Sequence, residues 1–225
     1  MDRSYATCPE LQCCMAALDD DGRRRLETAF QRFEVRGKGT VVFNQGAPAH
    51  YYFLCHGSVK LTHASAAGEE VILDVLSAPA VLSIQSHLGS GVQRFSAVSI
   101  APLVRVAHIK IQTLLDVTKD YSKAMEQLVL HLKQQTEKAY QTIACMTLPV
   151  RERLLAMLGL NFLLQGTPWI TVPLSSLELA QWVQTAPETM SRTLQQLRAE
   201  GIVAADSREG LNFKTSAIQQ SLEAL

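Results

Sequence analysis

The chain has 225 residues, which is enough for one large domain or two smaller ones. Apolar residues make up 47% and charged residues 19%, which predicts a packed core and excludes wholesale disorder. No apolar run reaches the roughly eighteen residues of a membrane span, and the N-terminus lacks the layout of a secretory signal. These observations predict a cytoplasmic protein without a membrane partner.

The cysteine count is odd, which does not fit a secreted disulfide framework. Cys8, Cys13 and Cys14 crowd the N-terminus, whereas Cys55 and Cys145 stand alone. Free thiols, a redox sensor and metal ligands all fit this pattern, and the sequence does not name a metal.

The first predicted element is a helix over 19–33, because apolar side chains recur at helical spacing from Leu26 to Phe33. Acidic residues at its start suit the helix dipole.

Residues 35–109 predict an antiparallel barrel or sandwich, since short β-branched and aromatic runs alternate with turn residues. The expected strands are TVVF, YYFL, SVKLTH, EEVILDVL, FSAVSI and LVRVAHI. Gly46, Gly57 and Gly68 recur every eleven residues and suit turns that need a positive φ.

Residues 110–147 contain no glycine or proline and predict helix with a break near Thr118. Such a helix packs either on its own barrel or against a second copy of the chain. Its second part, 119–147, spans almost four heptads, which favours a parallel two-fold dimer seam. The seam follows a 4-3-4-3 spacing through Tyr121, Met125, Leu128, Leu132, Gln135, Ala139, Thr142 and Met146. Of these, Gln135 and Thr142 are the polar seam positions.

Pro149 is a predicted hinge, and the apolar run RERLLAMLGLNFLL after it predicts a helix. The stretch PLSSLELAQWVQTAPETMSRTLQQLRAEGIV then predicts two short helices joined by a tight turn, a helix-turn-helix. Ser175 or Ser176 caps the first helix and Glu178 completes a capping box. Pro187 opens the second helix.

The second of these helices predicts one buried and one exposed side. Met190, Leu194 and Leu197 supply the buried stripe, and Gly201 ends the helix. The following IVAADSREGLNFK predicts a β-hairpin wing that turns near 209–210.

The exposed edge of that helix carries the functional prediction. Glu188, Ser191 and Arg192 lie at i, i+3 and i+4 near its N-terminus, where a recognition helix enters the major groove first. Arg192 can bond guanine O6 and N7, and Glu188 can accept from cytosine N4. Pro187 and Thr189 complete the predicted DNA-binding set.

The charge of this region argues against DNA binding. Residues 148–225 hold six Lys/Arg against seven Asp/Glu, so they have no basic excess. Phosphate contacts must then come from a few placed cations and from backbone N–H groups.

The helix-turn-helix stretch resembles that of the CRP/FNR superfamily of transcription regulators, and ETMSR resembles its FNR branch. The run GTVVFNQGAPAHYYFLCHGSVKLTHASAAGEEVILDVL is similar to the cyclic-nucleotide-binding-type barrel of the same regulators. The resemblance implies an α+β chain: a jelly-roll β-barrel sensor over 1–118, a dimerisation helix over 119–147 and a winged helix-turn-helix over 148–225. It also implies a homodimer on double-stranded DNA with TTGAT-type palindromic half-sites, about 34–36 Å apart.

The resemblance does not name the effector. Cyclic-nucleotide binders carry Gly-Glu-Leu where this chain has Ser83–Ile84–Gln85, and Arg94 is only a distorted echo of their phosphate motif, so cAMP is not expected. The N-terminal cysteines depart from the spacing of the iron–sulfur branch, which makes a cluster a poor match. Three hypotheses remain open: haem with a ligand such as His56, His87 or Cys55, a thiol switch at Cys55 or Cys145, and no ligand at all.

The expected mechanism is a population shift in which an effector repacks the seam and reorients the winged domains. The bound dimer would then contact or block RNA polymerase. No catalytic motif suggests an enzyme. A constitutive regulator and a winged helix that binds protein instead of DNA are the rival hypotheses.

Overall fold

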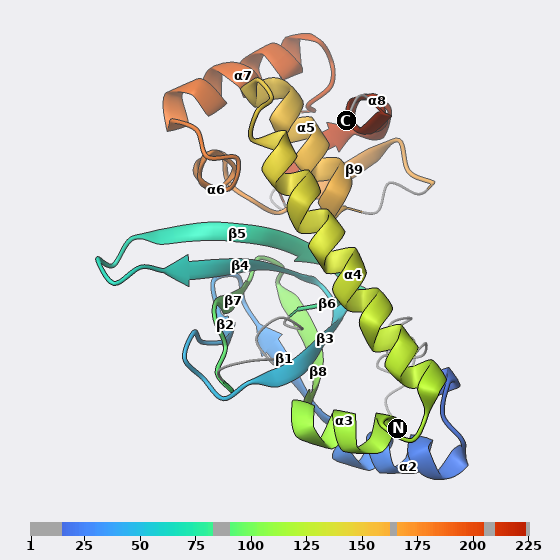
Figure 1. Ribbon diagram of the computed structural model, residues 1–225. Helices are drawn as coiled ribbons and strands as arrows, with labels where there is room; N and C mark the ends of the chain where they lie inside the picture. Colours follow the sequence, from blue (N-terminus) through green and yellow to red (C-terminus); the bar gives the residue numbers. More distant parts are fainter. Residues whose placement is uncertain (1–14, 83–90, 163–165, 205–209, 224–225) are drawn as a thin grey trace.

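The computed structural model describes residues 15–82, 91–162, 166–204 and 210–223. Within them the N-terminal half forms two antiparallel four-stranded sheets that face each other (Figure 1). In spatial order the first sheet contains β1 (Gln31–Arg36), β8 (Leu103–Lys110), β3 (His50–His56) and β6 (Ala80–Val81). The second contains β2 (Val41–Phe43), β7 (Ser96–Ser99), β4 (Ser58–Ala64) and β5 (Glu70–Ser77). This double sheet confirms the predicted jelly-roll class and the expected strand runs.

The strands form because their apolar residues alternate, so that one set fills the space between the sheets. Tyr52 and Leu54 of β3 point into this interior, whereas Tyr51 and Phe53 face the helices on the other side. The β3–β4 turn requires Gly57, which has φ +86°. A Cβ there would lie 2.3 Å from the carbonyl oxygen of Leu103.

The first helix is shorter than predicted. It is α2 (Asp20–Ala29), and Asp19 caps it by accepting from the Gly22 N–H at 2.8 Å. Phe30 is already extended, and Phe33 belongs to β1, which pairs with β8. The helical spacing of apolar residues therefore continues past the real end of the helix. The helix ends at Ala29 because the next residues pair with the distant strand β8.

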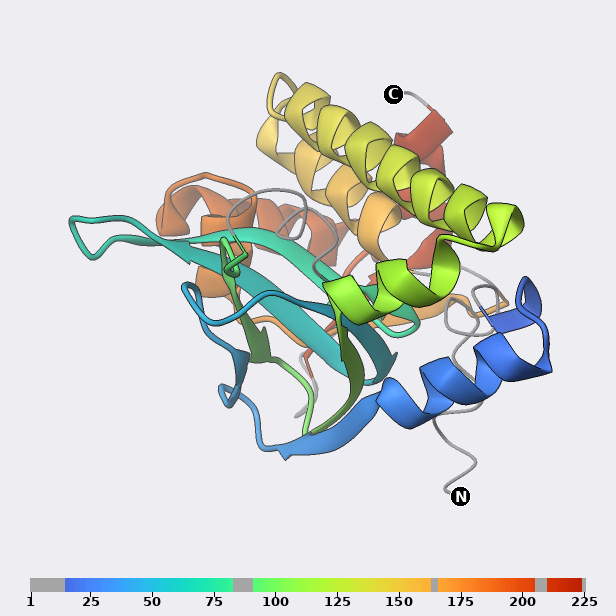
Figure 2. The same ribbon diagram turned by 60° about the horizontal axis from the view of Figure 1, so that its bottom comes forward.

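The predicted break near Thr118 is confirmed. α3 (Ile111–Thr118) and α4 (Ser122–Cys145) are separated by extended backbone at Tyr121. The Tyr121 hydroxyl donates to Asp19 at 2.7 Å, so the break is tied to the start of α2. α2 and α3 lie side by side next to the sensor sheets (Figure 2).

Part of the predicted seam on α4 faces the chain's own sensor. Leu128 is 6% exposed inside the cluster that covers the first sheet, so within the single chain it packs on its own sensor, and its place in a dimer stays a prediction. Three further seam residues are partly buried against the same cluster: Tyr121, Met125 and Leu132. Gln135 donates to the Val81 carbonyl at 2.9 Å.

Three of the four large apolar residues of α4 that face outward lie one position later in the heptad, and the fourth is Leu130. Val129, Tyr140 and Ile143 are 60%, 68% and 64% exposed, and we call them the outer stripe. Of the predicted seam residues, Ala139 is exposed beside this stripe and Met146 packs against the C-terminal core. The helix therefore uses neighbouring faces for its own sensor and for solvent.

The C-terminal part begins after Pro149 with α5 (Val150–Asn161), where a helix was expected. The helix-turn-helix follows as α6 (Ser176–Trp182) and α7 (Pro187–Ala199). Two elements of this part were not predicted: β9 (Trp169–Val172), which pairs with β10 (Leu211–Lys214), and α8 (Thr215–Glu223). Val203 bridges to Phe213 as a wing hairpin requires, and the predicted turn lies outside the described residues except for Gly210.

The sensor and the C-terminal part pack against each other through buried apolar residues. Ile72 and Val75 of β5 and Ile100 belong to the same cluster as the core of the C-terminal part. Within the described ranges, no helix has the length and apolarity needed to cross a membrane.

Candidate nucleic-acid interface and sensor pocket

The start of α6 is fixed by the predicted capping box. The Ser175 hydroxyl accepts from the Glu178 N–H at 3.2 Å, and a Glu178 carboxylate oxygen accepts from the Ser175 N–H at 2.9 Å. Each side chain thus satisfies a backbone donor that the helix leaves unpaired. α6 ends at Trp182, which is 1% exposed.

The turn between α6 and α7 is fixed by hydrogen bonds to α6 and to α5. Gln184 takes a positive φ of 53°, and the Thr185 N–H donates to the Ala180 carbonyl at 2.9 Å. Arg153 of α5 donates to the Val183 carbonyl at 2.9 Å and to that of Leu148. Sequence reasoning missed Arg153, although a cation within an apolar helical run was the available signal.

α7 buries one side and exposes the other, as predicted. Met190, Leu194 and Leu197 are at most 1% exposed, so the helix cannot rotate without breaking the core. The predicted reading residues all lie on the exposed side: Pro187, Glu188, Thr189, Ser191 and Arg192. Glu188 and Arg192 form no hydrogen bond or ion pair within the described part of the chain. Their carboxylate and guanidinium are therefore available to a ligand.

A hollow of about 580 Å³ lies beside this reading edge. Ser191 and Arg198 of α7 line it together with Ser175, Ser176 and the sensor residue Lys38. Both halves of the chain therefore contribute a cation to one hollow, which sequence reasoning did not foresee because the two positions are far apart in the chain.

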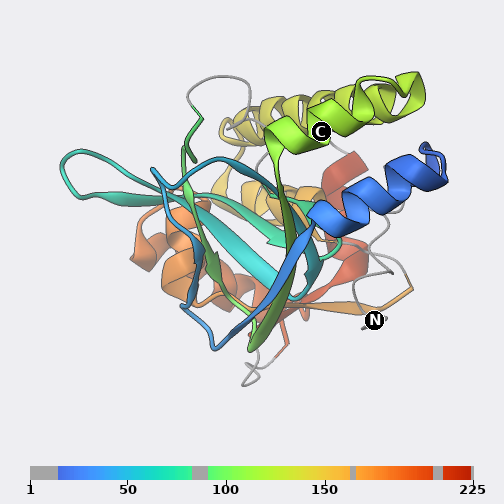
Figure 3. The same cartoon turned by 90° about the horizontal axis from the view of Figure 1, so that it is seen from below.

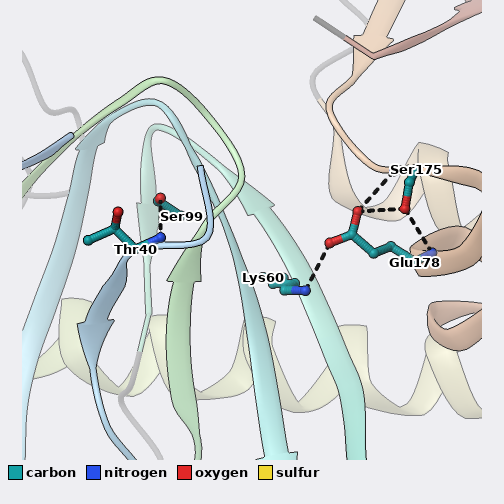
Figure 4. A network of polar contacts seen from close by, with 5 residues as sticks. All are labelled: Thr40, Lys60, Ser99, Ser175 and Glu178. Atoms are coloured by element: carbon teal, nitrogen blue, oxygen red, sulfur yellow. Dashed lines mark hydrogen bonds and ion pairs between the residues drawn. The ribbon is translucent and has the colours of Figure 1, made fainter. Parts of the chain in front are cut away.

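An ion pair joins the sensor to the helix-turn-helix next to this hollow. The Lys60 ammonium of β4 lies 2.8 Å from a Glu178 carboxylate oxygen, and the side chains are 17% and 27% exposed (Figure 4). Burial alone would raise the pKa of Glu178, but hydrogen bonds from Lys60 and Ser175 outweigh it and lower the pKa. The carboxylate thus stays ionised at neutral pH, and the stability it adds is lost only as the pH falls through this lowered pKa.

A second hollow, of about 550 Å³, lies between the β4–β5 ribbon and α4, and we call it the sensor pocket. Its lining is largely apolar, with Leu61, Leu76 and Phe95 among its residues, and Arg94 also lines it. Asp74 and Lys138 form an ion pair at 2.9 Å across it. Burial raises the pKa of Asp74, although the Lys138 ammonium opposes the shift. A carboxylate in this position is costly to keep charged.

The other candidate effector residues do not converge. Cys55 packs beside the sensor helices, His56 is exposed at the end of β3, and Cys145 is buried at the end of α4. Burial raises the pKa of the Cys145 thiol, which disfavours the reactive thiolate form. No group of three or more metal-ligating side chains occurs among the described residues. Four candidates lie outside those residues: Cys8, Cys13, Cys14 and His87.

Solved structures show the same arrangement of domains. FixK2 from Bradyrhizobium japonicum superposes with a TM-score of 0.69 at 18% identity, covering 85% of this chain and 96% of that one. CLP from Xanthomonas campestris, described as a c-di-GMP responsive global regulator, gives 0.66 at 18% identity, with 87% and 99% covered. TTHB099 from Thermus thermophilus, a CRP-family transcriptional regulator, gives 0.64 at 18% identity, with 86% and 96% covered. Similarity at this level of identity shows the fold.

Sequence comparison identifies both parts. Among curated proteins, none matches the chain. The model of the cyclic nucleotide-binding domain matches residues 34–121, and that of the Crp-like helix-turn-helix domain matches residues 146–213. Two matched domains in this order, on a fold shared with such regulators, place the chain in the CRP/FNR superfamily of DNA-binding transcription regulators.

Proposed function

We propose that the chain is a homodimeric regulator that reads a palindromic operator with α7 and acts on RNA polymerase by contact or by blocking it. The exposed edge of α7 carries this proposal. Arg192, Ser191 and Glu188 stand on a helix whose opposite side is locked in the core, so their positions are fixed before DNA arrives. Pre-positioned donors and acceptors of this kind read base edges in the major groove.

The dimer would form along α4. A palindrome needs two reading helices related by a two-fold axis. The outer stripe offers three exposed apolar residues on a helix of 24 residues, with Lys133 and Thr136 at the heptad positions between Val129 and Tyr140. These apolar residues support pairing with a second α4. Ala139 adds a small exposed residue beside the stripe, whereas Leu128 packs in the sensor core and is not part of this exposed face.

Selection from a pool of random duplexes tests the operator. We expect the protein to enrich a palindrome with TTGAT-type half-sites whose centres lie about 10–10.5 base pairs apart, because two-fold readers occupy successive major grooves. A transcription reaction on a template that carries the selected site then shows activation or repression. Enrichment of single, unpaired half-sites would contradict the dimer, and no enrichment would contradict the DNA proposal.

A winged helix that binds protein instead of DNA is the second candidate, because residues 148–225 hold six Lys/Arg against seven Asp/Glu. Recovery of no duplex from the pool, even at low salt, is the result that this candidate requires. At low salt even weak phosphate contacts support DNA binding, so salt cannot explain such a failure.

The sensor pocket would hold an amphipathic anion of less than about 550 Å³. Apolar walls suit the body of such a ligand, and Lys138 would bind its acidic group in place of Asp74. The dye 8-anilinonaphthalene-1-sulfonate is a suitable probe, followed by its fluorescence. We expect Asp74→Asn to strengthen its binding, because the competing carboxylate is gone.

The double variant Asp74→Asn/Lys138→Met should weaken dye binding by at least about tenfold relative to Asp74→Asn, because the charge-assisted bond is lost. Lys133→Met is the matched control, since Lys133 is on the same helix and 65% exposed. Equal affinity in all variants would contradict this pocket. A Soret band in the purified protein would instead support the haem hypothesis.

A further inference from the structure

The two faces of the β4–β5 ribbon contact different parts of the protein. Lys60 lies opposite Val75 on one face, and Leu61 lies opposite Asp74 on the other. Leu61 and Asp74 line the sensor pocket, whereas Lys60 contacts Glu178 and Val75 joins the core of the C-terminal part. A single layer of strand therefore separates the pocket from the helix-turn-helix, and α6 lies against it (Figures 1 and 3).

Apolar and polar contacts have different roles in this interface. The apolar contact through Ile72 and Val75 holds the two parts together but tolerates sliding, because hydrophobic burial has no direction. The Lys60–Glu178 pair has direction, since a charge-assisted hydrogen bond of 2.8 Å survives only in a narrow range of positions. The ion pair therefore selects one arrangement among those that the apolar contact allows.

The position of Glu178 at the start of α6 links the Lys60–Glu178 pair to the orientation of the reading helix α7. The Glu178 carboxylate accepts hydrogen bonds from Ser175 at the start of α6 and from Lys60, so the sensor is bonded directly to the first turn of that helix. α6 packs on α7 and the connecting turn is braced by Arg153. Holding α6 in place thus holds α7.

The orientation of the helix-turn-helix that this ion pair holds is compatible with DNA binding. The reading edge is exposed in it, and the hollow beside that edge carries Lys38 from the sensor and Arg198 from α7. A helix in the major groove is flanked by phosphates, and cations on its flank complement them. Lys38 thus brings a sensor cation to a hollow that Glu178 also lines, beside a C-terminal part without basic excess.

We propose that Lys60 and Glu178 are positioning residues, through which the outer face of the β4–β5 ribbon holds the helix-turn-helix in the orientation that reads DNA. This inference rests on the proposed function. In this role Lys60 touches no base, and its effect on DNA passes through the orientation of α6 and α7.

Distances between spin labels test the orientation without DNA. The labels replace Ala66 in the β4–β5 turn and Gln195 on α7, both exposed, in a full-length chain whose five cysteines are changed to alanine. We expect a narrow distance distribution that Lys60→Met broadens or shifts and that Lys60→Arg retains. Ser175→Ala is the matched control, because it weakens the cap of α6 but leaves the Lys60–Glu178 pair in place. An unchanged distribution in Lys60→Met would overturn the proposal.

Affinity for the selected operator is the second readout. We expect Lys60→Met to weaken it by at least about fivefold, the lower end of usual coupling between sites, and Lys60→Arg to restore it. Tighter binding by Lys60→Met would overturn the proposal, because the contact would then hold an inactive orientation. If the parent protein binds no operator, the proposed function fails, and the label distances still decide whether Lys60 sets the orientation.

Discussion

Replacing Arg192 by alanine is expected to weaken specific operator binding by about 1–3 kcal/mol, or about 5- to 150-fold. The Arg192 side chain is exposed and has no partner among the described residues, so its loss leaves the fold of α7 intact. Its guanidinium fork matches the O6 and N7 acceptors of one guanine, and alanine offers neither bond. Fluorescence anisotropy with the selected duplex and with a scrambled one measures the change.

Arg192→Lys is the matched control, since it keeps the charge but loses the fork. We expect it to retain affinity for the scrambled duplex while discriminating poorly at the guanine position. Circular dichroism and thermal melting should be unchanged in both variants. Equal affinity of Arg192→Ala and the parent for the selected duplex would contradict the reading role of this helix.

The helix-turn-helix could be predicted because its signals are local. The capping box of Ser175 and Glu178, Pro187 at the first position of α7, and the apolar stripe from Met190 to Leu197 each depend on residues a few positions apart. Local backbone chemistry and helical periodicity then fix both helices and the face that remains exposed. The structure changed none of these positions.

The contacts between distant segments could not be predicted in this way. Lys60 and Glu178 are 118 positions apart, and Asp74 and Lys138 are 64 apart. In the sequence each is an ordinary charged residue of a strand or helix, and only the three-dimensional arrangement pairs them. The same reason explains α2, whose helical pattern runs through Phe33 until pairing of β1 with β8 overrides it.

The heptad pattern on α4 predicted a buried face correctly, but α4 has apolar residues on two neighbouring faces, one against the sensor and one toward solvent. Leu128 and its companions face the sensor core, and the outer stripe follows the same spacing one residue later. Adjacent positions on a helix are about 100° apart, so a shift of one residue selects a different face. Periodicity predicts that a face is buried but cannot say against what.

The double variant Val129→Glu/Tyr140→Glu is expected to convert the dimer into monomers and to weaken operator binding by about a hundredfold or more. Two copies bound to adjacent half-sites gain affinity because the second contact is intramolecular, and this gain disappears with the dimer. Carboxylates at paired seam positions repel each other and cannot be solvated there. Analytical ultracentrifugation gives the oligomeric state, and anisotropy with the selected duplex gives the affinity.

Gln134→Glu/Gln141→Glu is the control that matches this change, because it adds the same charge to exposed residues on the neighbouring face of α4. We expect it to remain dimeric and to bind the operator nearly as well as the parent. Val129 and Tyr140 are 60% and 68% exposed in the single chain, so the double variant should keep the secondary structure of the parent. A stable dimer in Val129→Glu/Tyr140→Glu would show that α4 pairs through another face. Two reading helices one DNA turn apart would then need a different axis, which the spacing of the selected half-sites would reveal.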